Sequence, residues 1–315
     1  MKILANDGLD SAGKKMLEEA GFEIHTEKIP QEELPARIAE FDVLVVRSAT
    51  KVTSAVLESG NLKLVGRAGV GTDNIDMKRA AELGITVVNT PDAGSRSVAE
   101  LVVAHMFSLA RFLPLSNRQM PERGGAEFNQ LKKQASAGFE LRGKKLGIIG
   151  FGRIGQELAR MAVGLGMEIL IVDPKGRKFD LTLDFHPSLN LSPLSVIMES
   201  RDLGEVLEAS DFISLHTPGS AEVLGEKEIA QMKQGACLIN CARGGVVNEG
   251  ALLSALKEGR VAFAGLDVFH QEPPVNNPLL LHPHVSLSPH IGARTVEAQE
   301  RVGLELAQGI INHFS

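Results

Sequence analysis

The chain has 315 residues, 43% of them hydrophobic and 23% charged, with a formal net charge of −6 at pH 7. This balance is typical of a globular protein long enough for two domains, and it excludes a disordered or collagen-like chain. Because no long basic run occurs, we expect neither nucleic acid nor an anionic membrane as a partner, so a few placed arginines must hold any anionic ligand.

The first 90 residues alternate short β-rich runs with helical patterns. The run from Val43 to Val46 is apolar throughout, as expected for a strand buried on both faces. Strands separated by helices predict a parallel sheet covered on both sides. The predicted strands are 3–5, 22–25, 43–46, 62–65 and 85–88, and the predicted helices are 9–20 and 31–40.

Residues 95–113 have a long helical pattern that is apolar nearly all round. Such a helix is usually buried in a core or between subunits. The stretch from Pro114 to Gly143 is polar and contains Pro121 and two adjacent glycines. We therefore expect an irregular connection there.

A second alternating series begins at Lys145, while the segment from Gly176 to Ser200 has weak periodicity and receives no assignment. The whole pattern predicts an α/β protein of two doubly wound parallel-sheet domains, with the last helix returning to the first domain. The predicted strands are 146–149, 169–172, 212–215, 237–240, 263–268 and 285–287, and the last helix starts at about Thr295.

The two cysteines and the amino terminus bear on the compartment. Cys237 and Cys241 are near each other in the sequence, in a predicted strand. An extended strand would place them roughly 13 Å apart in space, too far for a disulfide. Polar Asn6, Asp7 and Gly8 stand where a signal peptide would have its apolar core. A transmembrane helix needs about 18 consecutive apolar residues, and no apolar run in the chain is that long. We expect a reducing, cytoplasmic setting.

A glycine-rich motif follows the predicted strand at 146–149 and opens a predicted helix. In this context G-x-G-x-x-G is typical of dinucleotide binding. Gly150 permits the tight turn, Gly152 lets the backbone approach a pyrophosphate, and Gly155 allows close helix packing. The amides at Arg153 and Ile154 lie at the helix N-terminus, which favours phosphate. The alternative is a glycine turn that binds nothing.

Asp173 ends the next predicted strand, close to the roughly 20-residue spacing at which a carboxylate binds the adenosine ribose. Its negative charge would repel a 2′-phosphate and predicts NAD rather than NADP as the cofactor. Lys175 and Arg177 lie close by in the sequence and weaken this preference.

Three polar segments follow later strands, and the carboxyl ends of parallel strands are where open α/β sheets bind ligands. They contain Arg243, Glu272 and His290. A histidine suits proton transfer near neutral pH, a carboxylate orients it, and an arginine grips a substrate carboxylate. Taken singly, each residue has an ordinary structural explanation. A metal site of His270, His282, His284 and His290 lacks the usual ligand spacing.

At these motifs the chain resembles the D-2-hydroxyacid dehydrogenase family. The resemblance rests on LGIIGFGRIG, NCARGGVVNEGAL, GLDVFHQEPP and SPHIGA, together with VNTP at 88–91. It implies that His290 is the general acid/base, Glu272 its partner and Arg243 the substrate-binding arginine. It also implies further NAD contacts from His216, Thr217, Pro218, Cys241, Ala242, Asp267 and Gly292.

The resemblance also implies the domain arrangement. A Rossmann-type cofactor domain, residues 97–281, would be inserted into a flavodoxin-like substrate domain made of residues 1–96 and 282–315. Family members usually dimerise through the cofactor domain, partly by the helix that corresponds to 95–113. We therefore expect a homodimer.

Two amino-terminal segments, VRSATKVT and VGRAGVGTDNID, are similar to the phosphoglycerate dehydrogenase branch of the family. This similarity implies 3-phospho-D-glycerate as substrate, with Arg47 and Arg67 on its phosphate, a use that suits planar arginine forks. The backbone at Val70 and Gly71, with Arg243, would hold the carboxylate, helped by Asn74. The alternative is that both amino-terminal arginines pair with acids.

Several features depart from that branch or leave other functions open. Arg294 stands where serine is common, and the segment from Gly176 to Ser200 is longer than usual. The chain ends at Ser315, so we expect no regulatory serine-binding domain and no serine feedback through one. Rival functions are a hydroxypyruvate/glyoxylate reductase, another D-2-hydroxyacid dehydrogenase, and an NAD-sensing transcriptional co-repressor.

Overall fold

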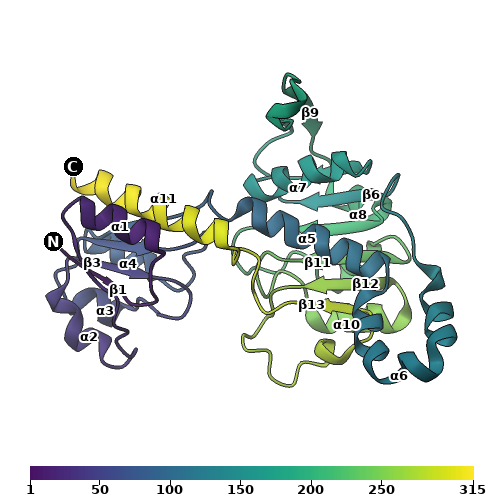
Figure 1. Ribbon diagram of the computed structural model, residues 1–315, viewed down its shortest axis with the longest axis horizontal. Helices are drawn as coiled ribbons and strands as arrows, with labels where there is room; N and C mark the ends of the chain where they lie inside the picture. Colours follow the sequence, from purple (N-terminus) through teal and green to yellow (C-terminus); the bar gives the residue numbers. More distant parts are fainter. The chain divides into compact units, whose positions relative to one another are not determined.

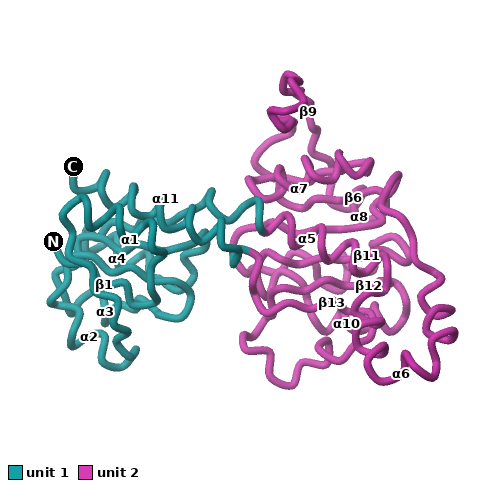
Figure 2. The backbone as a smooth tube through the Cα atoms, viewed as in Figure 1, with its two compact units in different colours: residues 1–97, 293–315 teal, residues 98–292 magenta.

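The protein is described by a computed structural model that covers residues 1–315. It divides into two compact units, which Figure 2 colours separately. Unit 1 consists of Met1–Ser97 with Ala293–Ser315, and unit 2 of Val98–Gly292. The chain therefore passes from one unit to the other twice, after Ser97 and after Gly292.

Unit 1 is built on a parallel five-stranded sheet in the order β2-β1-β3-β4-β5, with helices on both faces (Figure 1). Its strands are β1 (Lys2–Ala5), β2 (Glu23–His25), β3 (Val43–Val46), β4 (Leu64–Arg67) and β5 (Thr86–Asn89). Its helices are α1 (Ser11–Glu19), α2 (Leu34–Arg37), η1 (Ile38–Glu40), α3 (Ser54–Glu58), α4 (Met77–Glu82) and α11 (Val296–Phe314), and α5 (Ser95–Ala110) begins there.

The strand β3 shows why this sheet needs helices on both sides. Its four residues are fully buried, and alternate side chains point to opposite faces. Val43 and Val45 pack with α1 and α11, whereas Leu44 and Val46 pack with α2, α3 and α4. The carboxyl-terminal helix is thus part of the core of unit 1, as the sequence predicts.

Unit 2 contains a parallel six-stranded sheet in the order β13-β12-β11-β10-β6-β7. Its strands are β6 (Lys145–Ile149), β7 (Glu168–Val172), β10 (Phe212–Leu215), β11 (Ala236–Asn240), β12 (Val261–Leu266) and β13 (Val285–Leu287). Its main helices, besides most of α5, are α6 (Leu113–Gln134), α7 (Arg153–Gly164), α8 (Leu203–Ala209), α9 (Glu226–Gln231) and α10 (Glu249–Glu258).

Glycines in the sheet of unit 2 show which helices cover each face. A Cβ on Gly147 would lie 2.7 Å from Val206 of α8, and one on Gly265 would lie 2.9 Å from the Cβ of His105 on α5. The helices α8, α9 and α10 share one core cluster with the sheet, while α5 and α7 pack on the other face. The predicted α/β class with two parallel sheets is confirmed.

The second crossing between the units lies later than expected. We predicted that the cofactor domain ends at residue 281, but unit 2 extends to Gly292. The reason is that β13 pairs with β12, with Ala264 opposite Val285. This strand and the His290 segment after it therefore belong to the sheet of unit 2.

Two further expectations are corrected. The stretch from Pro114 to Gly143 is not an irregular connection, because α6 occupies most of it. Pro114 is at the helix start, where a missing N–H costs nothing. The segment that received no assignment forms an antiparallel hairpin of β8 (Lys178–Leu183) and β9 (Leu194–Glu199), which projects from unit 2 in Figure 1.

No single helix is both long enough and apolar enough to cross a membrane. By length and composition alone, the bent pair formed by Ser95–Ala110 and Leu113–Ala137 passes the same test.

Candidate active site

The glycine-rich loop between β6 and α7 has the geometry that the motif predicts. Gly150 has a φ of +95°, and a Cβ there would lie 2.6 Å from the carbonyl oxygen of His216. A Cβ on Gly155 would lie 2.3 Å from the carbonyl oxygen of Gly150, whereas nothing lies within 4 Å of one on Gly152. The first and third glycines are needed for packing, and the second leaves open space.

Asp173 lies directly after β7 and accepts hydrogen bonds at both carboxylate oxygens. Oδ2 accepts the N–H of Phe151 at 2.7 Å, and Oδ1 accepts the N–H of Lys175 at 2.8 Å. The carboxylate is therefore tied to the glycine loop. Each oxygen keeps a second lone pair for a ribose hydroxyl.

The end of β10 carries buried polar atoms without partners. His216 Nε2 lies 2.9 Å from Ser214 Oγ, but Nδ1 of His216 and Oγ1 of Thr217 make no hydrogen bond. Burial lowers the pKa of His216 to about 3, so the ring is neutral near pH 7. Unpartnered buried polar atoms are costly in a folded protein unless a ligand supplies partners.

These residues fit a dinucleotide. The first turn of α7, which begins with Arg153 and Ile154, has no side-chain cap, and a helix N-terminus of this kind binds phosphate through its backbone amides. The open space at Gly152, the carboxylate after β7 and the unpartnered polar atoms after β10 all lie at the carboxyl ends of neighbouring strands of this sheet. Pro218, which follows Thr217, is exposed.

His290 and Glu272, from two different loops of unit 2, form a hydrogen-bonded pair. His290 Nδ1 lies 2.7 Å from Glu272 Oε2, and Glu272 Oε1 accepts the N–H of Phe269 at 3.2 Å. The side chain of His290 is 50% exposed, which leaves Nε2 accessible. The backbone φ of His290 is +53°, an unusual value for a residue with a side chain.

Asp267, which is 1% exposed, holds the His290 segment in this conformation. Its carboxylate accepts the hydroxyl of Ser288 at 2.6 Å and the N–H groups of Ile291 and Gly292, both at 2.9 Å. Its backbone carbonyl accepts the N–H of His290 at 2.8 Å. The resemblance implies an NAD contact for Asp267, and in the structure its carboxylate hydrogen-bonds to this loop.

Sequence reasoning missed His105 on α5, which extends this network. Its Nδ1 lies 2.8 Å from Ser286 Oγ and its Nε2 lies 3.1 Å from Ser288 Oγ. Burial lowers the pKa of His105, so the ring is neutral and links α5 to the loop that carries His290. The only signal in the sequence is a polar residue within an apolar helix.

Arg243 lies in the loop after β11 and is half-buried. Its Nη1 donates to the carbonyl of Ala242 at 2.7 Å. Asn240, also missed from the sequence, folds this loop, because its side chain accepts the N–H of Ala242 and donates to the carbonyl of Arg243. Cys241 is buried beside them, and burial raises its pKa well above the ordinary value. It therefore stays a thiol.

The predicted substrate residues of unit 1 lie after β3 and β4. Arg47 follows β3, and Arg67 is the last residue of β4. The two strands are paired, with Val46 opposite Arg67. The N–H groups of Val70 and Gly71 donate no hydrogen bond in the structure, so both can bind an anion. Both N–H groups of the Asn74 amide are used, on the carbonyls of Arg47 and Thr50.

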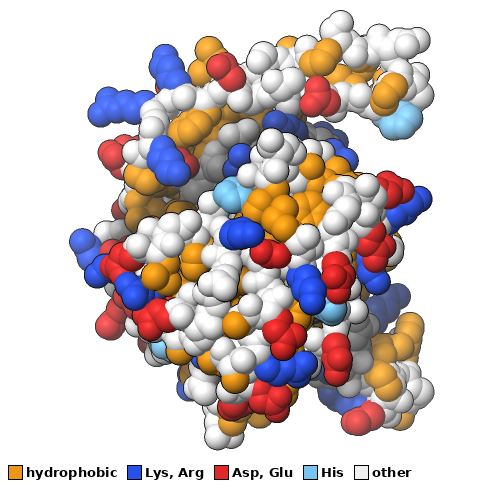
Figure 3. Space-filling view, turned by 90° about the vertical axis from the view of Figure 1, so that its left-hand side faces the viewer, with side chains coloured by type: hydrophobic (Ala, Val, Ile, Leu, Met, Phe, Trp, Pro, Cys, Tyr) orange, Lys and Arg blue, Asp and Glu red, His pale blue; other side chains and the backbone are white.

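The guanidinium of Arg47 has no ion pair, which argues against the alternative that this arginine is structural. On the face of the molecule drawn in Figure 3, basic and acidic side chains are interspersed rather than gathered by sign. No broad positive field covers this face, so an anion bound there would need individually placed arginines.

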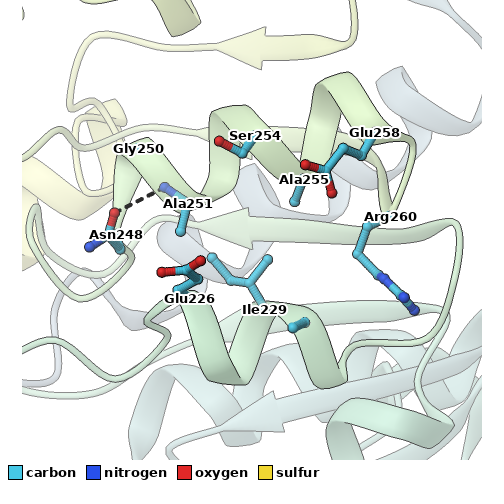
Figure 4. A pocket seen from close by; sticks show the side chains of 10 residues that line it. Glu226, Ile229, Asn248, Gly250, Ala251, Ser254, Ala255, Glu258 and Arg260 are labelled. Atoms are coloured by element: carbon cyan, nitrogen blue, oxygen red, sulfur yellow. Dashed lines mark hydrogen bonds between the residues drawn. The ribbon is translucent and has the colours of Figure 1, made fainter.

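Neither a metal site nor the groove between α9 and α10 coincides with these residues. No group of three or more histidine, cysteine or acidic side chains is arranged to hold a metal ion. His282 and His284 instead pack edge to face. A groove of about 470 Å³ lies between α9 and α10 (Figure 4), and its lining, which includes Glu226, Asn248 and Arg260, contains none of the predicted site residues.

Residues 103–292 match the protein-family model described as "D-isomer specific 2-hydroxyacid dehydrogenase, NAD binding domain". The chain is also similar in fold to an NAD⁺-bound 3-phosphoglycerate dehydrogenase of Entamoeba histolytica, with a TM-score of 0.77 and 26% identity over 100% of this chain and 95% of that one. The cofactor of unit 2 is therefore NAD(P).

Two curated relatives are similar over nearly the whole chain. The D-3-phosphoglycerate dehydrogenase of Methanocaldococcus jannaschii is 44% identical over 98% of this chain, which spans 57% of that relative's length. The hydroxypyruvate reductase of Thermotoga maritima is 42% identical over 99% of this chain and 98% of its own length. The chain thus belongs to the D-isomer-specific 2-hydroxyacid dehydrogenase family.

Proposed function

We propose that the protein oxidises 3-phospho-D-glycerate to 3-phosphohydroxypyruvate with NAD, a reaction of serine biosynthesis. The observation that supports the chemistry is the pairing of His290 with Glu272. The observation that supports a phosphorylated substrate is the unpaired guanidinium of Arg47.

His290 acts as the general base in this proposal. Glu272 holds Nδ1 as the protonated nitrogen, so Nε2 takes the proton of the substrate hydroxyl. The carboxylate then stabilises the imidazolium that forms. NAD, when bound, accepts the hydride that leaves C2. In the reverse direction, protonated His290 donates to the carbonyl oxygen.

The substrate's two anionic ends are held by different groups. Arg243 and the free amides of Val70 and Gly71 hold the carboxylate, since oriented N–H donors bind an oxyanion. Arg47 and Arg67 hold the phosphate through planar guanidinium forks. Asn74 supports them by fixing the backbone of Arg47 rather than by contacting the substrate.

We further infer a preference for NAD over NADP from Asp173, which lies where the adenosine ribose binds and would repel a 2′-phosphate. We also propose a homodimer through unit 2. The outward side of α5 keeps Leu101 and Val103 partly accessible and Phe107 43% exposed, and a partner would bury them.

Hydroxypyruvate reduction is the second candidate. The relative from Thermotoga maritima is named for that activity, and the two chains match over almost their full lengths. This activity uses the same acid/base pair and the same carboxylate site. It does not need an arginine pair for phosphate.

Consumption of NADH with 3-phosphohydroxypyruvate, hydroxypyruvate and glyoxylate tests both candidates. The chain has no Trp and no Tyr, so protein fluorescence scarcely disturbs that of the cofactor. We expect kcat/KM to be larger for the phosphorylated acid by about 100-fold, equal to about 2.7 kcal/mol. Equal values for the three acids would overturn the phosphoglycerate assignment. No turnover with any of them would favour a co-repressor-like binding protein.

A further inference from the structure

Arg294, which no sequence motif assigns to a role, lies on the same side of unit 1 as the arginines proposed to bind phosphate. The strands β3, β4 and β5 are parallel neighbours, so Arg47, Arg67 and the loop after Asn89 all lie at the carboxyl ends of these strands. That loop packs on the segment of Arg294, because a Cβ on Gly94 would lie 2.9 Å from the Cβ of Ala293.

The backbone around Arg294 is fixed on both sides. Gln299 donates to the carbonyl of Ala293 at 2.7 Å, and Thr295 caps α11 by accepting the N–H of Ala298 at 3.1 Å. Ser97 lies 2.9 Å from the Thr295 hydroxyl. The side chain of Arg294 is exposed and makes no hydrogen bond or ion pair. Its backbone is therefore fixed while its guanidinium has no partner.

Arg294 also lies close enough to Arg47 for the two charges to repel. Burial lowers the pKa of Arg47 most, and the positive charge of Arg294 lowers it further, whereas Asp7 and Asp10 raise it. Neither acid forms a salt bridge with Arg47 or Arg294, and Asp7 instead lies 3.7 Å from Lys28 Nζ. Asp7 accepts the N–H groups of Arg47 and Thr50 and the Thr50 hydroxyl, and Asp10 caps α1.

Two unpaired guanidiniums close enough to repel each other are unfavourable in the free protein, and an anion bound by both would relieve the repulsion. A phosphate monoester carries about two negative charges near pH 7 and three acceptor oxygens. It can therefore receive donors from two arginines on separate segments, which a single carboxylate accommodates less well.

We propose that Arg294 is a specificity-determining residue that contacts the substrate phosphate together with Arg47. This inference rests on the proposed phosphoglycerate dehydrogenase function and deepens it. The site then has a guanidinium from the carboxyl-terminal segment in addition to those after β3 and β4. It selects a dianionic head group over a neutral hydroxyl.

Three variants of the full-length protein test the proposal: Arg294→Ser, Arg294→Lys and the control Arg37→Ser. The side chain of Arg37, on α2, is 49% exposed. Its replacement by serine removes one positive charge from unit 1, as Arg294→Ser does. We expect Arg294→Ser to lower kcat/KM for 3-phosphohydroxypyruvate about 10-fold or more, with unchanged kcat/KM for hydroxypyruvate. Arg294→Lys should restore part of the loss, and the control should match the parent protein.

A second measurement uses inorganic phosphate as a probe that does not react. We expect phosphate to inhibit hydroxypyruvate reduction competitively in the parent protein and at about 10-fold higher concentration in Arg294→Ser. If the parent prefers the phosphorylated acid and Arg294→Ser keeps that preference, the inference is wrong and the proposed function stands. If the parent shows no such preference and phosphate does not compete, the proposed function fails first.

Discussion

The two units share an architecture but differ in how their polar groups are satisfied. In unit 2 the side chains at the ends of β11, β12 and β13 are hydrogen-bonded within the unit. Asp267 accepts three donors, Asn240 folds the loop of Arg243, and His290 pairs with Glu272. In unit 1 the groups after β3 and β4 include an unpaired Arg47 and free amides at Val70 and Gly71.

This difference shows how one type of sheet can serve two purposes. Proton transfer requires a ring held in one orientation, so internal hydrogen bonds are useful in unit 2. Anion binding requires donors that are placed but not yet used, so missing internal partners are useful in unit 1. Changes in the two units should therefore have separable kinetic effects.

The largest expected effect comes from His290. His290→Ala should lower kcat by about 10³-fold, because it removes the general acid/base, while the Kd for NADH measured by fluorescence titration stays unchanged. His186→Ala, on the exposed hairpin, is the matched control. Retention of most of the activity would show that the proton carrier is another group.

Arg47 should produce the opposite pattern. Arg47→Ala should lower kcat/KM for 3-phosphohydroxypyruvate about 100-fold, mainly through KM, and leave hydroxypyruvate reduction nearly unchanged. Steady-state kinetics with both acids measures the split. An equal loss with both substrates would place Arg47 in the folding of unit 1 rather than in phosphate recognition.

A smaller effect is expected for cofactor choice in unit 2. Asp173→Asn removes the charge and keeps one of the two oxygens that accept loop amides, so the ratio of kcat/KM for NADH over NADPH should fall about 10-fold. Asp180→Asn on the hairpin, an exposed neighbour, is the control. An unchanged ratio would assign cofactor choice to other groups.

The smallest expected effect concerns pH and stability. Burial lowers the pKa of His216 to about 3 and also lowers that of His105, whereas in the unfolded chain both are near 6.5. Below pH 6.5 the unfolded chain binds protons that the folded chain does not. Each histidine should therefore reduce the free energy of unfolding by up to about 1.4 kcal/mol per pH unit as the pH falls.

Denaturant unfolding at pH 7.5 and 5.5 measures this dependence. His216→Asn and His105→Asn should each make the loss between the two values smaller, whereas His313→Asn, on an exposed residue, should leave it unchanged. The same pH dependence in the parent protein and the three variants would mean that neither His216 nor His105 causes it.

Much of the fold follows from local pattern. Continuous apolar runs such as Val43 to Val46 and the glycine motif at Gly150 predicted the strands, the α/β class and the cofactor unit. Failures occurred where local pattern is weak or misleading. The polar composition of α6 concealed a helix, and the short strand β13 was assigned to the wrong domain because its pairing with β12 is not local.

The sequence by itself determined the family, the NAD(P) fold and the identities of the residues proposed for chemistry, because these depend on motifs and on the order of strands and helices. Only the tertiary structure decided how their polar groups are satisfied. It joined His105 to Ser288 and Asp267 across α5 and two strands, used both N–H groups of the Asn74 amide, and left Arg47 and Arg294 unpaired. Hydrogen-bond partners distant in sequence are set by folding in three dimensions, so no local pattern reveals them.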